Sequence, residues 1–294
     1  MYPASFEYVA PTTLDDAFAH LDAHGDDGKV LAGGQSLIPL MKLRFAAPAV
    51  LVDINHVADL GDTIATGDDG VVIGARVRHR DCERSEHLKG RYAALGRAAP
   101  QISDPIVRNH GTLCGSLAHA DPQGDWASVL LAAGAEATIR GPGGASRTSS
   151  IDDLLTGPFM TTLEPNELIT EVRVPDPGPR ASGTYLKLER KIGDFATVGV
   201  AVQVSLSNGT IGRAGIALTG VGPTNMRARA AEEALAGRAP DDDAIREAAK
   251  LAAEAAEPRD DVRGTVDFKR SVVRVYTERG LRQAVAEAQA GQEG

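Results

Sequence analysis

The chain has 294 residues, enough for about two domains, and its 43% hydrophobic and 24% charged residues are ordinary for a soluble globular protein. Forty acidic residues against 31 lysines and arginines leave a net charge of −9, which argues against non-specific binding to nucleic acid or to an anionic membrane. Two cysteines are too few for a disulfide framework or a cysteine-ligated cluster, and no apolar run approaches the ~18 residues of a membrane span.

The first 55 residues alternate between helix and strand patterns. Residues 12–24 begin with a capping threonine and carry apolar side chains at helical spacing, so they predict a helix. The apolar runs 29–32 and 50–54 predict strands, and residues 36–43 between them predict a second helix. The chain is therefore expected to open with a β-α-β arrangement.

Short elements continue through the middle of the chain. Residues 70–74 predict a strand, and residues 168–174 predict another that ends at Pro175. Residues 87–99 predict a helix, and the apolar run 128–137 leads into a strand pattern and a glycine-rich turn. These patterns agree with the abundance of glycine and proline, which favours tight turns.

The segment Pro175-Asp176-Pro177-Gly178-Pro179 is the clearest linker, because three prolines in five residues cannot continue a helix or the interior of a sheet. We place a domain boundary there.

Beyond this boundary, Asn208-Gly209 is a strong signal for a two-residue hairpin turn. Antiparallel strands followed by helices predict an α+β fold class. The strands are expected at 184–190, 198–207 and 211–218, and the helices at about 227–236, 241–256 and 268–289.

The first candidate site is the loop Ala32-Gly33-Gly34-Gln35-Ser36-Leu37-Ile38-Pro39. Paired glycines let successive backbone N–H groups turn toward an anion without a Cβ in the way. The alternative is an ordinary turn between a strand and a helix. Lys42 and Arg44 follow this loop, where they either neutralise a phosphate or face solvent.

The second candidate site is the stretch from Asn109 to Trp126, which is rich in small and polar residues and too long for a single turn. Small residues allow a backbone to approach a bulky ligand closely. The alternative is a surface loop in which Asp125 caps the helix that follows.

Other motifs give weaker signals. Neither the dinucleotide G-x-G-x-x-G pattern after the first strand nor the phosphate-binding G-x-x-x-x-G-K-[ST] pattern occurs. His79, Cys82 and His87 lack a fourth ligand and the regular spacing of a zinc site, so we expect them at the surface. His110 and His119, which flank the second loop, are expected to be simple hydrogen-bonding residues.

Taken together, the loops resemble the FAD-binding subunits of the molybdenum hydroxylase family, which includes xanthine dehydrogenase and aerobic carbon monoxide dehydrogenase. The resemblance covers nearly all of the chain and is strongest to the medium subunit of the carbon monoxide dehydrogenase branch. It is carried by residues 32–44, by Val107-Arg108-Asn109-His110-Gly111-Thr112 running to Asp125, and by Tyr185-Leu186-Lys187-Leu188-Glu189-Arg190-Lys191-Ile192-Gly193-Asp194-Phe195-Ala196.

The resemblance implies two domains. Residues 1–177 would form an FAD-binding domain of the vanillyl-alcohol-oxidase type, in two subdomains divided near 55–60. Residues 178–294 would form a smaller flavoprotein domain of antiparallel strands and a helix bundle, which closes over the flavin.

The resemblance also implies the binding residues. Ala32, Gly33, Gly34, Gln35, Ser36 and Leu37 would form one clasp for the FAD pyrophosphate, and Gly111, Thr112, Leu113, Cys114 and Gly115 the other. Asp125 matches a position that contacts the cofactor, and Ile102, Ile169 and Lys187 match positions near the flavin. Cys114 departs from the family, which more often has glycine there. Lys187 is either a solvated strand lysine or a cation beside the pyrimidine edge of the flavin.

The function that this resemblance implies is electron relay, from [2Fe-2S] clusters on a partner through FAD to an external acceptor such as a quinone, with no catalytic or metal-binding residue in this chain. Partners would be a large molybdenum-binding subunit and a small iron–sulfur subunit, in a dimer of heterotrimers. Carbon monoxide, an N-heterocycle, a purine and an aldehyde stay open as substrates. The rival hypotheses are a self-sufficient FAD-dependent oxidase and a non-enzymatic subunit that has lost the flavin. Since the N-terminus lacks a signal-peptide pattern, we expect a cytoplasmic protein, free or associated with the inner face of the membrane.

Overall fold

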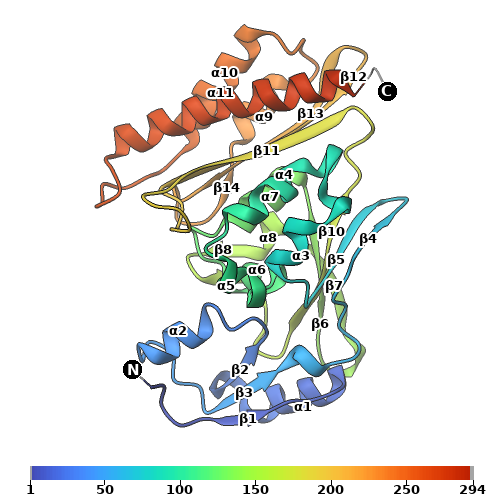
Figure 1. The fold of residues 1–294 in the computed structure, drawn as a ribbon, viewed down its shortest axis with the longest axis vertical. Coiled ribbons are helices and arrows are strands. Elements are labelled where there is room, and N and C mark those ends of the chain that lie inside the picture. Colours follow the sequence, from blue (N-terminus) through green and yellow to red (C-terminus); the bar gives the residue numbers. More distant parts are fainter. Residues whose placement is uncertain (1, 292–294) are drawn as a thin grey trace.

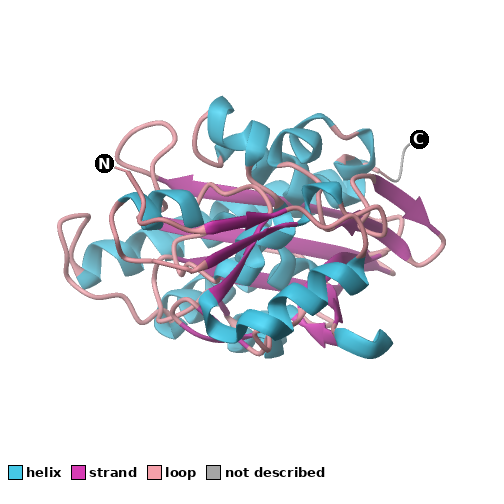
Figure 2. Ribbon diagram, turned by 90° about the horizontal axis from the view of Figure 1, so that it is seen from below, coloured by secondary structure: helices cyan, strands magenta, loops and turns pink. Residues whose placement is uncertain are grey.

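Within residues 2–291, which the computed structural model describes, the strands form a three-stranded, a five-stranded and a four-stranded sheet and one small hairpin. The sheets follow one another along the long axis of the molecule in chain order, with the N-terminal sheet at one end and the C-terminal helices at the other (Figure 1). Figure 2 shows the same strands from below, with helices packed around them. No helix in this part of the chain is long and apolar enough to cross a membrane.

The N-terminal sheet is parallel and confirms the predicted β-α-β pattern. It contains β1 (Glu7–Val9), β3 (Val50–Asp53) and β2 (Gly28–Leu31), in that order. Helix α1 (Leu14–His24) begins at Thr13, whose Oγ1 accepts a hydrogen bond from the N–H of Asp16, and η1 (Gly25–Asp27) follows it. Helix α2 (Leu37–Lys42) leaves the first glycine loop. The sequence analysis missed β1, which is three residues long and largely exposed.

The central sheet is antiparallel, and helices and turns surround it. Its order is β4 (Ile64–Gly67), β5 (Gly70–Gly74), β10 (Leu168–Pro175), β6 (Glu136–Arg140) and β7 (Ser146–Ser150). The helices are α3 (His79–Arg84), α4 (Ala93–Ala98), α5 (Pro105–His110), α6 (Leu113–His119), α7 (Asp125–Ala133) and α8 (Ile151–Leu154). Shorter elements are η2 (Ile54–His56), η3 (Glu86–Leu88), η4 (Gly90–Tyr92), η5 (Ala99–Gln101), η6 (Pro142–Gly144), β8 (Leu155–Gly157) and β9 (Met160–Thr161). Trp126 of α7 is fully buried in the hydrophobic core that the central sheet and its helices share.

One helix prediction in this region is wrong in extent. The helix expected at 87–99 breaks into η3, η4 and the short α4, because Gly90 adopts a left-handed conformation with φ of +59° that an α-helix cannot continue. The apolar run 128–137 divides between α7, which ends before Gly134, and the start of β6 at Glu136.

The C-terminal sheet is antiparallel and confirms the predicted strands and hairpin. Its order is β11 (Ala181–Leu188), β12 (Val198–Ser207), β13 (Thr210–Thr219) and β14 (Met226–Arg227). Asn208 and Gly209 between β12 and β13 have φ of +51° and +79°, the left-handed values of the turn that their sequence predicts. Helices α9 (Arg229–Leu235), α10 (Asp242–Ala255) and α11 (Val266–Ala290) follow.

Side chains of the C-terminal sheet divide between two cores. Val198, Val200, Val202 and Val204 of β12 alternate onto the face that α9, α10 and α11 cover. Ala201 of the same strand belongs instead to the core around α4 and α7. The sheet therefore lies between its own helices and those of the preceding region, as Figure 1 shows for β11. The strand β10 ends at Pro175 and β11 begins at Ala181; the domain boundary between them stays a prediction.

Candidate functional site

The two glycine loops, distant in sequence, lie against each other. The first joins β2 to α2. In the second, residues 111–112 join α5 to α6; the rest of the stretch from Asn109 to Trp126, expected to be a loop, contains α6 and the start of α7. A Cβ added at Gly33 would lie 2.4 Å from the carbonyl oxygen of His110 and 2.6 Å from the Cα of Gly111. Since no side chain fits in that space, glycine at position 33 is what allows the two backbones to meet.

The first loop presents unpaired backbone donors. Within residues 2–291, no hydrogen bond uses any of the five successive N–H groups of residues 33–37. The side chain of Gln35 folds back, with its Nε2 3.3 Å from the carbonyl oxygen of Gly33, and the Ser36 side chain forms no cap. Successive free N–H groups in a turn form a concavity that suits an anion.

Backbone hydrogen bonds join the second loop to the segment that follows β5. The N–H of His79 donates to the carbonyl of Gly111 at 2.9 Å, and the N–H of Leu113 donates to the carbonyl of Val77 at 3.3 Å. Thr112 begins α6, and its Oγ1 accepts from the N–H of Gly115 at 3.1 Å. In the described part of the chain, the N–H groups of Thr112 and Cys114 have no partner.

Cys114 is accommodated because its side chain turns inward. The thiol is 3% exposed, and Sγ lies 3.9 Å from the carbonyl oxygen of Gly74 in the central core. Burial raises the pKa of this thiol to about 12, so it stays neutral. The loop can therefore carry a cysteine in place of the usual glycine, since the sulfur occupies the core and takes no hydrogen bond from the loop N–H groups.

Asp125 and Lys187, predicted separately as cofactor neighbours, form one buried ion pair. Lys187 Nζ lies 2.9 Å from Asp125 Oδ2, and the hydroxyl of Tyr185 donates to Asp125 Oδ1 at 2.6 Å. The Lys187 side chain is 2% exposed, so the solvated-lysine interpretation is wrong. The capping interpretation of Asp125 is also wrong, because Gly124 precedes the helix and the carboxylate binds β11 instead.

The pair sits in a polar network that joins α7 to the C-terminal sheet. Burial raises the pKa of Asp125, against the opposing effect of the Lys187 ammonium and its hydrogen bonds, and raises that of the Tyr185 hydroxyl well above its ordinary value. Lys187 Nζ also donates to the carbonyl of Gln101 at 2.8 Å and lies 3.5 Å from Glu189 Oε2. With its donors directed at protein oxygens, Lys187 can act on a neighbouring ligand mainly through its charge.

The remaining predicted residues lie in or beside the central core. Ile102 follows Gln101, whose carbonyl binds Lys187, and its side chain packs against the cluster that contains Leu113 and Ile169. Contact of these apolar side chains with a cofactor stays a prediction. Arg44 is directed away from the loop, since its Nε donates to the carbonyl of Tyr2, and Lys42 is exposed.

The histidines and Cys82 are placed differently from the expectation. His79 and Cys82 are buried rather than on the surface, whereas His87 is exposed. Trp126 Nε1 donates to His79 Nδ1 at 3.0 Å, and burial lowers the pKa of His79 to about 4, so the ring is neutral with its proton on Nε2. The ring of His119 packs against Phe159 with centroids 5.2 Å apart, and His110 is exposed. Among the described residues, no group of three acidic, histidine or cysteine side chains could hold a metal ion.

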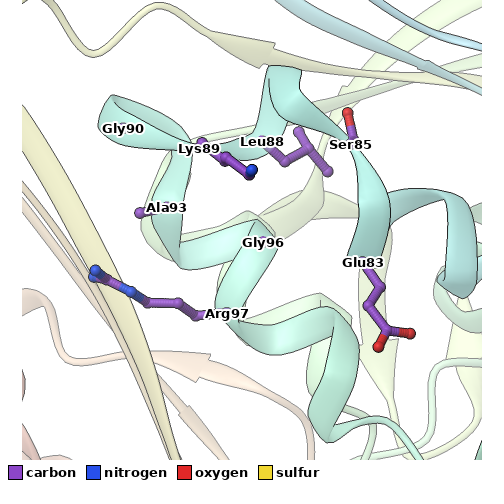
Figure 3. Close-up of a pocket in the computed structure, with 8 residues that line it drawn as sticks. All are labelled: Glu83, Ser85, Leu88, Lys89, Gly90, Ala93, Gly96 and Arg97. Atoms are coloured by element: carbon purple, nitrogen blue, oxygen red, sulfur yellow. The ribbon is translucent and has the colours of Figure 1, made fainter.

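A surface hollow of about 270 Å³ lies apart from these loops. It is lined by residues of α3, of α4 and of the segment that joins them (Figure 3): Glu83, Ser85, Leu88, Lys89, Gly90, Ala93, Gly96 and Arg97. None of the predicted cofactor residues lines it, so the hollow is not the candidate site.

The sequence analysis missed Arg78 and Asn55. The side chain of Arg78 reaches the carbonyl of His110, and the Asn55 amide donates to the carbonyl of Ala32 at 2.8 Å. No local signal marks either residue, because each acts on a segment more than 20 positions away in sequence.

Comparison with known proteins gives matches over the whole of this architecture. The family described as FAD binding domain in molybdopterin dehydrogenase matches residues 4–177, and the CO dehydrogenase flavoprotein C-terminal domain matches residues 183–284. The chain is 41% identical over 286 residues to the carbon monoxide dehydrogenase medium chain of Hydrogenophaga pseudoflava, covering 97% of this chain and 99% of that one.

Two further matches extend the comparison. The 6-hydroxypseudooxynicotine dehydrogenase complex subunit alpha of Paenarthrobacter nicotinovorans is 36% identical over 289 residues, covering 98% of this chain and 97% of that one. A chain in the solved structure of carbon monoxide dehydrogenase from Hydrogenophaga pseudoflava, in a form that lacks the Mo-pyranopterin moiety of the molybdenum cofactor, matches with a TM-score of 0.93 and 43% identity. That match covers 98% of this chain and 99% of the other.

Proposed function

The chain belongs to the FAD-binding subunits of the molybdenum hydroxylases, as predicted, and from this premise we propose that its two glycine loops hold the diphosphate of FAD. The chain is thus an oxidoreductase component with the α+β, two-domain FAD-binding fold that the sequence predicts. The observation that carries the proposal is the run of five unpaired N–H groups at residues 33–37, joined by those of Thr112 and Cys114.

The residues present fit a diphosphate-bearing cofactor. Residues 32–37 would bind through backbone N–H groups, and residues 111–115 would add a second set from the adjoining loop. Asp125, Ile102, Ile169 and Lys187 would lie nearer the flavin, with the Lys187 charge favouring an anionic ring. When bound, FAD supplies electron transfer in steps of one or two electrons, and the protein contributes binding, orientation and charge.

The proposal places this chain between an iron–sulfur partner and an external acceptor such as a quinone. Cys82 and Cys114 are both buried and free, and a [2Fe-2S] cluster needs four ligands, so the clusters would lie on a small partner subunit. A large partner subunit would hold the molybdenum cofactor and the substrate pocket, in a cytoplasmic dimer of heterotrimers, free or at the inner face of the membrane. Carbon monoxide is the first substrate to test, since the similarity to a carbon monoxide dehydrogenase medium chain is high over the whole chain.

Anaerobic mixing tests this role. The purified chain loaded with FAD is mixed with carbon monoxide or an N-heterocycle while the flavin absorbance is recorded. We expect no bleaching by the lone chain, and bleaching when the molybdenum and iron–sulfur subunits are added. Bleaching by an organic substrate with no partner present would contradict electron relay and favour a self-sufficient oxidase.

Acid precipitation tests how the cofactor is held. We expect all of the yellow colour in the supernatant, because the binding groups are backbone donors and the Cys114 thiol is buried and neutral. Colour that stays with the precipitated protein would mean a covalent link and would contradict this mode of binding.

A further inference from the structure

A continuous set of hydrogen bonds connects the two glycine loops through Asn55 and Arg78. The Asn55 Nδ2 donates to the carbonyl oxygen of Ala32 at 2.8 Å. The Arg78 guanidinium donates through one nitrogen to Asn55 Oδ1 and through another to the carbonyl oxygen of His110. We call this set the loop bridge, defined by Ala32, Asn55, Arg78 and His110.

The orientation of the Asn55 amide is fixed by its surroundings. Its Nδ2 lies 2.6 Å from Asp53 Oδ1, which also accepts the Asn55 backbone N–H at 2.8 Å. Tyr8 donates to the other carboxylate oxygen of Asp53 at 2.6 Å and so holds that carboxylate in place. Because Nδ2 faces two acceptors, Oδ1 must face the guanidinium.

Each anchored carbonyl belongs to the residue directly before a loop glycine. The trans peptide is planar, so its C=O and N–H point in opposite directions. Holding the carbonyl of Ala32 toward Asn55 therefore aims the unpaired N–H of Gly33 toward the opposite side. Holding the carbonyl of His110 toward Arg78 fixes the peptide plane that leads into Gly111.

Arg78 is suited to bridge two acceptors because its guanidinium is a rigid, planar fork. Its backbone is also immobilised: its N–H donates to Asp81 Oδ2 at 3.0 Å, and the residue pairs with Thr112 in an antiparallel bridge. The side chain is half-buried between the loops, where salt and water screen it less than at the surface.

We propose that Arg78 is a positioning residue that sets the spacing of the two loops through Asn55 and the His110 carbonyl, and thereby the spacing of the N–H groups offered to the FAD diphosphate. This inference rests on the proposed function of the loops. It assigns to Arg78 a geometric role that a lysine, a single point charge on a flexible stem, cannot fill.

The test measures FAD affinity of the full chain by titrating apoprotein, together with the thermal midpoint of the apoprotein. Arg78→Lys, Arg78→Gln and Asn55→Ala are each expected to weaken FAD binding roughly tenfold or more, the effect of losing a charge-assisted hydrogen bond. Arg147→Gln is the matched control, because it removes another paired arginine, bound to Glu167, that contacts neither loop. Its FAD affinity is expected to equal that of the wild type.

A double-mutant cycle separates the bridge from two independent effects. If Arg78 and Asn55 act through one bridge, Asn55→Ala combined with Arg78→Lys weakens binding no more than the weaker-binding single variant. Wild-type affinity in Arg78→Lys would mean that charge alone suffices and would overturn the proposal, as would losses that add fully in the double variant.

Failure of the inference is distinguishable from failure of the proposed function. If Gly34→Trp abolishes FAD binding while the Arg78 variants bind as the wild type does, the loops bind FAD and the bridge proposal is wrong. If neither Gly34→Trp nor any bridge variant changes FAD affinity, the loops are not the binding site and both proposals fall.

Discussion

The glycine loops and the interface between α7 and the C-terminal sheet differ in whether their polar groups have hydrogen-bond partners within the protein. At the loops, seven backbone N–H groups have no partner within residues 2–291. At the interface, the buried side chains of Tyr185 and Lys187 each donate a hydrogen bond to the buried Asp125 carboxylate. Residues 33–37 are partly or fully exposed, so an unpaired N–H costs little there, and the first loop can keep donors ready for a ligand. Thr112 and Cys114 are buried, so their unpaired N–H groups are costly unless a ligand supplies the acceptor. The interface, by contrast, satisfies its own polar groups.

The buried network extends beyond the ion pair. Asn225 Nδ2 donates to Ser128 Oγ at 2.7 Å and to the carbonyl of Gly124 at 2.9 Å, and Thr219 Oγ1 donates to Ser128 Oγ at 2.6 Å. Ser128 belongs to α7, whereas Thr219 ends β13 and Asn225 directly precedes β14. The Tyr185 hydroxyl lies 3.3 Å from Thr219 Oγ1 and so connects this group to the ion pair. The network therefore fixes how the two regions meet, and the loops depend on it only indirectly. The comparison predicts that loop variants change FAD affinity, whereas interface variants change stability.

The largest effect is expected from Asp125→Ala. Removing the carboxylate leaves the buried Lys187 ammonium without its nearest carboxylate, with Glu189 Oε2 still 3.5 Å away, which costs up to about 3–5 kcal/mol in the free energy of unfolding. Urea denaturation of the apoprotein measures it. The control is Asp125→Asn combined with Lys187→Gln, which keeps hydrogen-bonding groups without charge and should recover most of the loss. A stable Asp125→Ala protein that has lost only FAD affinity would show that Asp125 acts on the cofactor and not on the interface.

His79 touches both regions and predicts a dependence on pH. Its folded-state pKa of about 4 lies below the ordinary 6.5, so the unfolded chain binds the proton more readily. The neutral His79 therefore contributes fully to the free energy of unfolding above pH 6.5, and this contribution is lost as the pH falls toward 4. At about 1.36 kcal/mol for each pKa unit, the difference between the two pKa values corresponds to a loss of about 3 kcal/mol.

The measurement is the free energy of unfolding of the apoprotein between pH 4 and 7. His79→Gln should flatten the slope across that range, and His87→Gln, which changes an exposed histidine, should leave it as in the wild type. If the free energy of unfolding of His79→Gln depends on pH as steeply as that of the wild type, other groups control the acid sensitivity.

At the loops, Gly33→Ala is expected to weaken FAD binding about 10–100-fold, the equivalent of the roughly 1–3 kcal/mol of overpacking. The new Cβ would meet the His110 carbonyl, which belongs to the backbone and cannot move without separating the loops. Fluorescence titration with FAD measures the change. Gly67→Ala is the matched control, since a Cβ there would meet only the Gly70 carbonyl oxygen, at 4.0 Å, and Gly67, like Gly33, does not have a left-handed φ. Equal affinities in the two variants would contradict the contact between the loops.

The smallest change in the free energy of unfolding is expected from Arg97→Gln, which breaks a partly exposed ion pair between α4 and α11. Arg97 forms two hydrogen bonds with Glu287, at 2.8 and 2.9 Å, and both side chains are 36% exposed. Because solvent screens this pair, Arg97→Gln should cost about 0.5–1 kcal/mol of unfolding free energy and leave FAD affinity unchanged. Thermal unfolding of the Arg97→Gln variant at low and high salt measures this change. A loss of unfolding free energy as large as that of Asp125→Ala would contradict the distinction between buried and exposed ion pairs.

Much of the fold follows from local patterns. Helix α1, strands β2, β3 and β5 and the hairpin at Asn208-Gly209 lie close to where spacing, apolar runs and turn residues predict them. The helix expected at 87–99 is wrong because its apolar residues fit a helix while Gly90 adopts a conformation that ends one. Both glycine loops were found from composition, because glycine at a turn is a local signal.

What the sequence determined by itself is the longer elements with clear apolar spacing, the two glycine-rich segments and the family. What the tertiary structure decided is which polar side chains meet. Asp125 and Lys187 stand 62 positions apart, and their pairing exists only because α7 packs on the C-terminal sheet. Trp126 and His79 are 47 positions apart, and the core that encloses them turns an expected surface histidine into a buried, neutral one. Local patterns report backbone conformation and which face is apolar, whereas the partner of a buried charge depends on the docking of distant elements.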